Sequence, residues 1–347
     1  MIAHVYSDLR DVYTAASSPA KNATTPAEPT DAEVTQAIKS SFLRLDHEIV
    51  WSHIDNVIKA NSKALATKLL APALAGSCAL LAFYDTNTQL LRVACTGDCR
   101  AVLGRRVDAN TWSATPLSSD QTGANPDEIT RIQSEHPDEK DVTKNGRLLG
   151  YEPSRVFGDA SLKWPRKLSL TIREFFYGKF PSEKVITPPY ATAEPVVTTT
   201  RIHPEKGDFV VMACDGLWEM LSNEEVVALV AEWMDKKPQP GNNTTPEPKK
   251  TIWSSFFGIT NVDKSAITLP PVVSSPDSDK FYALPPNRPR QWKISEGADS
   301  TGGRRREFVI KDANAATHLI RNGLGGGDHD LVSSLLMLGG KNARRFR

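Results

Sequence analysis

Two aspartates lie beside a glycine at points where the sequence changes from one element to the next, and their carboxylates could bind a cation. Asp215 follows the strand-like run Asp208–Cys214 and precedes Gly216, so the end of a rigid strand would present its carboxylate to a hard divalent cation. Asp98 lies in Thr96–Arg100, between two further apolar runs. Each pair also has a purely structural interpretation, since Asp-Gly is common in strand-to-helix turns and Gly-Asp in hairpin turns. The residues alone leave both interpretations open.

A third segment, Gly146–Asp159, interleaves arginine, glycine and aspartate over an irregular stretch. We expect Arg155 to pair with Asp159 or with another buried acid, because a buried guanidinium needs a charged partner. This segment therefore predicts an ion pair that stabilises the fold rather than a simple turn.

The four cysteines lie in apolar or strand-like stretches, not in the dense spacing of a small secreted scaffold. Cys95 and Cys99 are four residues apart without a second cysteine pair or a histidine pair, so a zinc site has little support. We therefore expect Cys95 and Cys99 to be buried thiols, and the use of cysteine in the chain indicates a reducing compartment.

Periodicity predicts the elements that position these segments. Thr30 and Glu33 form a capping box ahead of a helix whose apolar residues recur at helical spacing. Short β-type runs at 77–84, 89–95 and 100–105 predict an antiparallel three-stranded meander. Further strands are predicted at 194–202 and 208–214, and helices near Pro126, after a second capping box at Ser222 and Glu225, and at 312–321 and 328–338.

Composition sets the limits of the fold. The 347 residues allow one large domain with insertions or two smaller ones, and we expect a single domain over 1–347. Residues 14–30 are predicted to be a loop and 236–306 an exposed low-complexity insertion, because neither has enough periodic apolar residues to form a core.

Charge and hydropathy argue against a nucleic-acid-binding protein and against a membrane-spanning one. With 42 basic and 41 acidic residues, the net charge of +1 gives no field that would gather nucleic acid, and the clusters at 304–306 and 344–347 are read as solvated loop charge. No run is long and apolar enough to span a membrane, and the first residues show no targeting segment.

Taken in order, three motifs carry a family resemblance. Gly97–Leu103, Ser154–Asp159 and Ala213–Glu219 resemble the successive signatures of the metal-dependent, type 2C protein serine/threonine phosphatases. Lys163-Trp164 and the segment 187–195 resemble the pyruvate dehydrogenase phosphatase branch of that family.

The resemblance implies a fold, a cofactor and a substrate. It implies an α+β fold in which a two-layer antiparallel β-sandwich is flanked by helices, with a Mg²⁺ or Mn²⁺ pair that activates a bridging water. Asp215 would be a ligand of that pair, Asp98 would help to hold a further metal, and Arg155 with Asp159 would support the site. The substrate would be a phosphoserine or phosphothreonine protein, namely the E1 subunit of pyruvate dehydrogenase, and the compartment would be the mitochondrial matrix.

This sequence also departs from the family pattern. An Asp-Gly-His segment near the domain start, a phosphate-binding arginine upstream of it and an acidic pair after the last helices are absent from these residues, and cysteine replaces the usual serine at Cys99. We therefore expect the fold to be incomplete at both ends, leave the catalytic residues unassigned and expect little turnover from this chain. The alternative is a non-catalytic relative that binds phosphoproteins or a partner.

Overall fold

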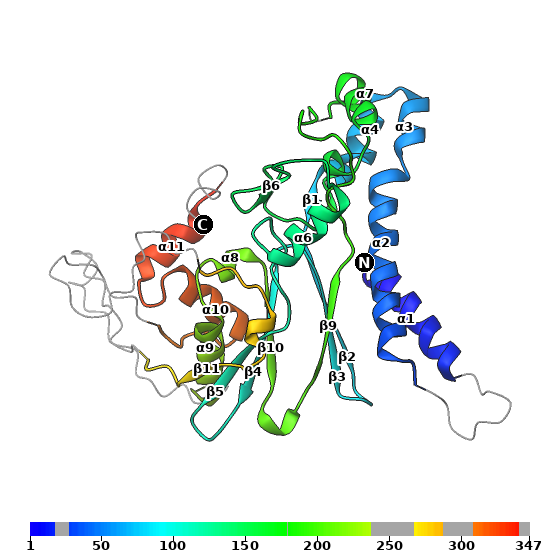
Figure 1. Cartoon of the computed structure of the whole chain (residues 1–347). Helices are drawn as coiled ribbons and strands as arrows, with labels where there is room; N and C mark the ends of the chain where they lie inside the picture. The colour runs from blue at the N-terminus through cyan, green and yellow to red at the C-terminus, as the bar shows by residue number, and fades with distance from the viewer. Residues whose placement is uncertain (18–27, 179, 237–266, 287–307, 340–347) are drawn as a thin grey trace, which may run out of the picture. The chain divides into compact units, whose positions relative to one another are not determined.

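The computed structural model describes residues 1–17, 28–178, 180–236, 267–286 and 308–339 (Figure 1). It combines α-helices with several small, mostly antiparallel sheets, which confirms the predicted α+β class. The chain divides into two compact units. Unit 1 comprises Met1–Ala101, Pro116–His203 and Asp279–Ala283, and unit 2 comprises the described parts of Val102–Thr115, Pro204–Ser278 and Leu284–Arg347.

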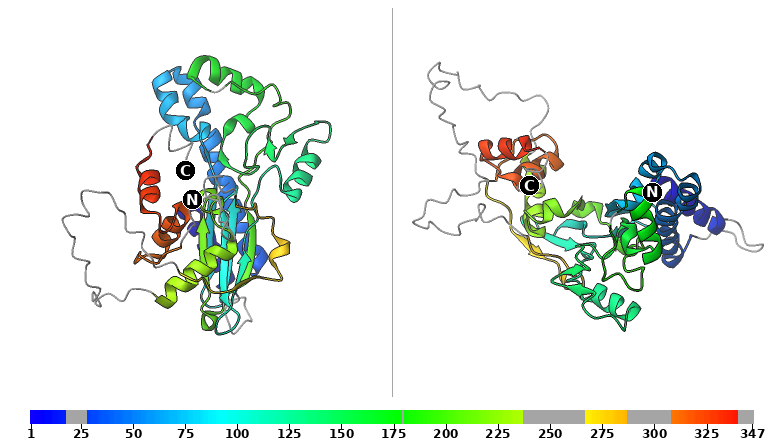
Figure 2. Two further views of the ribbon diagram at one scale, coloured as in Figure 1. Left: turned by 90° about the vertical axis from the view of Figure 1, so that its left-hand side faces the viewer. Right: turned by 90° about the horizontal axis from the view of Figure 1, so that it is seen from above.

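Unit 1 is built on a three-stranded antiparallel sheet of order β2-β3-β9. Two helices, α1 and α2, pack against each other and bury their apolar faces against this sheet (Figures 1 and 2). Phe42 and Phe157 meet in that core with ring centroids 5.3 Å apart. The elements are α1 (Ile2–Ser17), α2 (Asp31–Trp51), β2 (Ala79–Asp85), β3 (Leu90–Thr96) and β9 (Val196–Arg201).

The start of α2 confirms the predicted capping box. The Glu33 amide donates to Thr30 Oγ1 at 3.3 Å, and the Thr30 amide donates to Glu33 Oε2 at 2.8 Å. The predicted loop over 14–30 is wrong in its first four residues, because α1 continues through Ser17. Small residues extend that helix readily, and Pro19 disfavours helical backbone only at the residue before it. Residues 18–27 lie outside the described part of the chain.

The remaining elements of unit 1 are short helices, one 3₁₀ turn and two-residue strands. The helix predicted near Pro126 is confirmed as α6, and Asn125 caps it by accepting from the Asp127 amide. These elements are α3 (Ile54–Ala60), α4 (Lys63–Leu69), α5 (Ala71–Leu74), β1 (Gly76–Ser77), α6 (Pro126–Glu135), β6 (Thr143–Lys144), β7 (Arg147–Leu148), β8 (Phe157–Gly158), the 3₁₀ turn η1 (Ala160–Leu162) and α7 (Arg166–Phe176).

Unit 2 has a four-stranded sheet of order β10-β4-β5-β11. Its core gathers Trp112, Trp218 and Leu229 with Phe209 packed alongside. The second predicted capping box is confirmed, since the Glu225 amide donates to Ser222 Oγ at 3.1 Å. The elements are β4 (Arg100–Arg106), β5 (Trp112–Pro116), η2 (Pro204–Lys206), β10 (Phe209–Ala213), α8 (Asp215–Trp218), α9 (Asn223–Lys236), β11 (Val272–Ser274), η3 (Ser278–Lys280), α10 (Ala315–Leu324) and α11 (His329–Met337).

The predicted three-stranded meander is wrong. Strands β2 and β3 pair as expected, with Ala79 opposite Thr96, but β4 pairs with β10 and β5 in another sheet. Strand propensity indicates that a strand forms but not which strand it pairs with, because pairing depends on side-chain burial far along the chain. Val102 of β4 is buried in the core of unit 2, and this burial favours the second sheet.

Part of the predicted insertion is ordered. Val272 to Ser274 form β11, which pairs in parallel with Trp112 to Ala114 of β5. Ile267 and Leu269 pack against the core of unit 2. This stretch has too few apolar residues for a core of its own, but it completes a core that other elements have built. Residues 237–266 and 287–306 of the predicted insertion lie outside the described residues.

The longest described helix, α2, has 21 residues and carries acidic residues from its first turn onward. Within the described ranges, none of the helices is both long and apolar enough to cross a bilayer.

Candidate functional site

The turn after β3 is held in place by a buried glutamine. The Gly97 amide donates to Gln121 Oε1 at 2.7 Å, and the Gln121 amide group donates from Nε2 to the Cys95 carbonyl at 3.0 Å. Gly97 has φ +106°, and a Cβ at this position would lie 2.3 Å from Cys78 Sγ. Glycine is required here for both its backbone conformation and its lack of a side chain.

Asp98 follows Gly97 and is half-buried. Its carboxylate lies within hydrogen-bonding reach of the Cys78 thiol, and its amide donates to the Cys78 sulfur. The strands on either side of this turn belong to different sheets, so the hairpin interpretation of Gly97-Asp98 is wrong. The turn instead leads the chain from one sheet to another.

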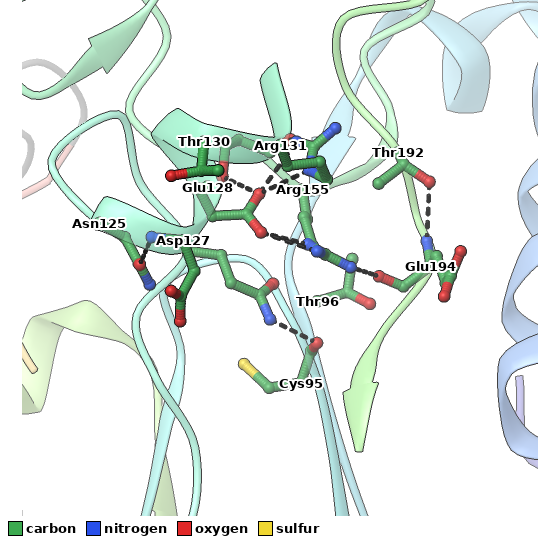
Figure 3. Close-up of polar contacts among 12 residues, drawn as sticks. Cys95, Thr96, Asn125, Asp127, Glu128, Thr130, Arg131, Arg155, Thr192 and Glu194 are labelled. Carbon is green, nitrogen blue, oxygen red and sulfur yellow. Dashed lines mark hydrogen bonds and ion pairs between the residues drawn. The ribbon is translucent and has the colours of Figure 1, made fainter. Parts of the chain in front are cut away.

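A buried glutamate on α6 organises the segment behind this turn (Figure 3). Glu128 Oε1 accepts from Arg155 Nε at 2.8 Å and pairs with its Nη2 at 2.7 Å. Glu128 Oε2 accepts from Arg131 Nη2 at 2.9 Å and from Ser154 Oγ at 2.7 Å. Arg155 Nη1 in turn donates to the Glu194 carbonyl at 2.8 Å. The Glu128 carboxylate therefore joins α6 to the 154–155 loop, and Arg155 extends the connection to the backbone at Glu194.

The electrostatics of this cluster favour the charged form of the glutamate. Burial opposes ionisation of Glu128, but the hydrogen bond from Arg155 and the charges of Arg155 and Arg131 outweigh it and lower its pKa. Glu128 is therefore ionised at neutral pH and fully paired.

Arg155 was expected to pair with Asp159 or with another buried acid, and the structure selects the second alternative, Glu128. Asp159 has a left-handed backbone at φ 41°, its amide donates to the Ala75 carbonyl at 2.8 Å, and its carboxylate lies against Gly76. Asp159 thus braces the segment before β1 rather than neutralising Arg155.

Lys163 is one of the residues on which the resemblance to one branch of the family depends. It also has a structural role in this fold. Its ammonium contacts both carboxylate oxygens of Asp46 at 2.7 Å and donates to the Val156 carbonyl. Burial lowers the pKa of Lys163, although the Asp46 carboxylate opposes this shift. The pair ties α2 to the segment that carries Arg155.

Asp215 is the first residue of the short helix α8 and is exposed. Its Oδ1 accepts from the Gly216 amide at 2.8 Å. Gly216 has no positive φ, and a Cβ there would meet nothing closer than Cys214 Sγ at 3.7 Å. The backbone at residue 216 therefore does not require glycine, and the strand end presents Asp215 without a special conformation.

Comparison with known proteins decides the family. The sequence profile of the family described as protein phosphatase 2C matches residues 4–247. The chain belongs to the protein phosphatase 2C family. A protein phosphatase 2C homolog of Schizosaccharomyces pombe is 38% identical over 92% of this chain and 61% of its own length. The mitochondrial pyruvate dehydrogenase phosphatase 1 of Saccharomyces cerevisiae is 36% identical over 90% of this chain and 52% of its own length.

The chain thus spans about half to three fifths of the length of these phosphatase 2C relatives. Among solved structures, the serine-threonine phosphatase 2C of Toxoplasma gondii aligns with a TM-score of 0.37 and 15% identity, covering 68% of this chain and 72% of that one.

The two carboxylates that the phosphatase 2C resemblance singles out lie in different units, Asp98 in unit 1 and Asp215 in unit 2. The resemblance predicts that the two carboxylates lie close together, and this stays a prediction. Both provide the oxygen donors that Mg²⁺ and Mn²⁺ prefer. Within the described residues, however, no three His, Cys, Asp or Glu side chains gather closely enough to hold a metal ion. These residues by themselves do not make up a metal-pair site.

Three residues that hold the Gly97-Asp98 turn or its support were not predicted. Glu128 was not singled out in the sequence, although it is the acid that Arg155 needs. Gln121 and Cys78 carried no sequence signal, because their roles depend on which strands pair.

Proposed function

We propose that the whole protein is a metal-dependent protein serine/threonine phosphatase. The observation that carries the proposal is the phosphatase 2C profile, which covers residues 4–247 and includes all three motifs. Asp215 supports it, because an exposed carboxylate at the end of strand β10 is accessible to a cation.

We further propose that the substrate is the phosphorylated E1 subunit of pyruvate dehydrogenase and that the protein acts in the mitochondrial matrix. The support is the S. cerevisiae relative, which bears the name of a mitochondrial pyruvate dehydrogenase phosphatase and is 36% identical to this chain. Lys163 and Trp164, which carry the branch resemblance, are buried in unit 1.

The cofactor of this activity would be Mg²⁺ or Mn²⁺, with Asp215 and Asp98 among its ligands. When bound, such ions lower the pKa of a water and offset charge on the phosphate. Because the described residues do not assemble a metal-pair site, no catalytic step is assigned to them beyond cation binding at these two carboxylates.

The test is Mn²⁺-dependent release of phosphate from a phosphoserine peptide that copies an E1 phosphorylation site. Two chains are compared, the 347-residue chain and a chain extended with the residues of the S. pombe relative that lie outside the matched region. The extended chain should turn over the peptide, and a chelator should abolish this activity. The 347-residue chain should show little turnover, because two carboxylates carry too little charge to hold two cations about 4 Å apart.

Asp215→Asn in the extended chain should abolish turnover, because the amide keeps the shape but loses the charge that binds a cation. Asp330→Asn is the matched control, since Asp330 is also an exposed acid of unit 2. Chelator-insensitive turnover would contradict the metal mechanism. Peptide binding without turnover in the extended chain would favour the alternative of a non-catalytic phosphoprotein-binding relative.

A further inference from the structure

Cys78 lies directly over the Gly97-Asp98 turn. It connects β1 to β2, and the pairing of Ala79 with Thr96 places it beside Gly97 in the neighbouring chain segment. A Cβ on Gly97 would lie 2.3 Å from Cys78 Sγ and 2.6 Å from its Cβ. The space that glycine leaves empty is therefore filled by the side chain of Cys78.

The thiol of Cys99 meets that of Cys78. The two side chains are joined by a hydrogen bond, and both residues are half-buried, so a small oxidant can reach them. The same hydrogen bond raises the pKa of Cys78. Because Gly97 has no side chain, the Cys78 sulfur can lie against the turn that leads to Cys99.

The other two cysteines are arranged differently. Cys95 is fully buried, and its thiol donates to the backbone carbonyl of Cys99 at 3.1 Å. Burial raises the pKa of the Cys95 thiol. Cys214 is exposed and belongs to unit 2. All four cysteines lie in the described part of the chain, and none of them forms a disulfide.

We propose that Cys78 and Cys99 form an oxidation-sensitive dithiol that closes to a disulfide when the protein meets a hydroperoxide. In the first step one thiol attacks the peroxide, forming a sulfenic acid and releasing water or an alcohol. In the second step the neighbouring thiol attacks the sulfenic sulfur, so that an S–S bond forms and a second water leaves. The two cysteines together lose two electrons and two protons, and the peroxide is reduced.

The disulfide would change the surroundings of Asp98. It would link the residue before β2 to the residue after Asp98 and remove the thiol hydrogen that faces the Asp98 carboxylate. The turn would then be fixed by a covalent bond in addition to its hydrogen bonds with Gln121. Formation of the bond does not depend on the phosphatase proposal, whereas any effect of the bond on turnover rests on it.

The experiment treats the full 347-residue chain with hydrogen peroxide, blocks remaining thiols with N-ethylmaleimide and digests it with trypsin. Cleavage after Arg92 separates Cys78 from the peptide 93–100, which carries both Cys95 and Cys99. The expected product is a cross-linked pair of these two peptides that has lost two hydrogens. Fragmentation should place the link at Cys99 and the maleimide at Cys95, and dithiothreitol should separate the peptides.

Two variants and one control complete the test. Cys78→Ser and Cys99→Ser should each abolish the cross-link, whereas Cys214→Ser should leave it intact. If Cys78 and Cys99 stay open to N-ethylmaleimide after Cys214 has been fully oxidised, the proposal is wrong. It is equally wrong if the link joins Cys95 or connects two chains through Cys214.

A second readout separates this proposal from the phosphatase proposal. In the extended chain, peroxide should lower turnover, dithiothreitol should restore it, and Cys99→Ser should be resistant to peroxide. If the cross-link forms in a chain that never turns over phosphopeptide, the dithiol proposal stands and the phosphatase proposal fails. If turnover is present but the cross-link never forms, the phosphatase proposal stands and the dithiol proposal fails.

Discussion

Asp98 and Asp215 each lie two residues beyond the end of a strand, yet their surroundings differ. Asp98 is half-buried against Cys78, and the glycine before it is held by Gln121. Asp215 is exposed, and the hydrogen bond to its carboxylate comes from the adjacent Gly216 amide.

The comparison shows two ways to position a carboxylate. In unit 1, buried side chains from distant segments hold the backbone around the acid, so folding and site geometry are coupled. In unit 2, the strand end alone positions the acid, and few interactions would be lost if it changed. We therefore expect substitutions behind Asp98 to reduce stability and substitution of Asp215 to leave it unchanged.

The largest effect is expected for Glu128→Gln. The variant keeps the shape of the side chain but leaves the largely buried Arg155 without its counter-charge and Arg131 with only its surface partner Glu135, which should cost about 3 kcal/mol of unfolding free energy. Urea denaturation followed by circular dichroism would measure it. Glu135→Gln is the matched control, because Glu135 pairs with the same Arg131 at the surface and should change stability by less than about 0.5 kcal/mol. Equal losses of unfolding free energy in the two variants would mean that the buried Glu128 cluster stabilises the fold no more than a surface ion pair does.

Acid should weaken the same cluster. Glu128 has a folded pKa below its ordinary value of 4.5, so its contribution is present above pH 4.5 and is lost as the pH falls through the folded pKa. The stability difference between the native chain and Glu128→Gln should therefore shrink as the pH falls below 4.5. Urea midpoints of both chains between neutral pH and mild acid provide the test. A constant difference over this range would contradict the ionised state of Glu128.

A smaller loss is expected for Gln121→Ala. This change leaves the Gly97 amide and the Cys95 carbonyl without the glutamine, which should cost about 2 kcal/mol. Gln36→Ala is the control, because Gln36 is an exposed glutamine of unit 1 that bonds Ser40 Oγ. Amide hydrogen exchange at Gly97 should accelerate in the first variant only. Unchanged exchange there would show that Gln121 does not hold the turn.

The smallest effect on stability is expected for Asp215→Asn. The side chain is exposed, so the free energy of unfolding should change by less than about 0.5 kcal/mol. Thermal melts of the two chains would establish this. A loss of unfolding free energy as large as that of Gln121→Ala would contradict the difference proposed between the two aspartates. It would indicate a structural role for Asp215.

The sequence predicted the features that depend on neighbouring residues. Both capping boxes, the helix beginning at Pro126 and the strand that leads to Asp215 were confirmed, because a few consecutive side chains determine each of them. The family prediction was confirmed as well, since its three motifs are short and occur in a fixed order.

Features that depend on distant residues were not predictable. The partner of β4 and the place of β11 are decided by burial in a core that is assembled from remote segments. The pairing of Glu128 with Arg155 has no local signature, because Arg155 lies 27 residues further along the chain. The meeting of Cys78 with Cys99 likewise follows from strand register and not from a local pattern.

The parallel pairing of β11 with β5 has a consequence for how the chain acquires its structure. Val272 and Trp112 are neighbours in the sheet although about 160 residues separate them. During synthesis, β5 leaves the ribosome long before its edge partner exists, whereas β2 and β3 are joined by a short turn and can pair at once. The outer edge of β5 therefore exposes unpaired backbone N–H and C=O groups while the residues between β5 and β11 are synthesised. In this interval a chaperone would be most useful, because it would prevent this edge from pairing with another chain.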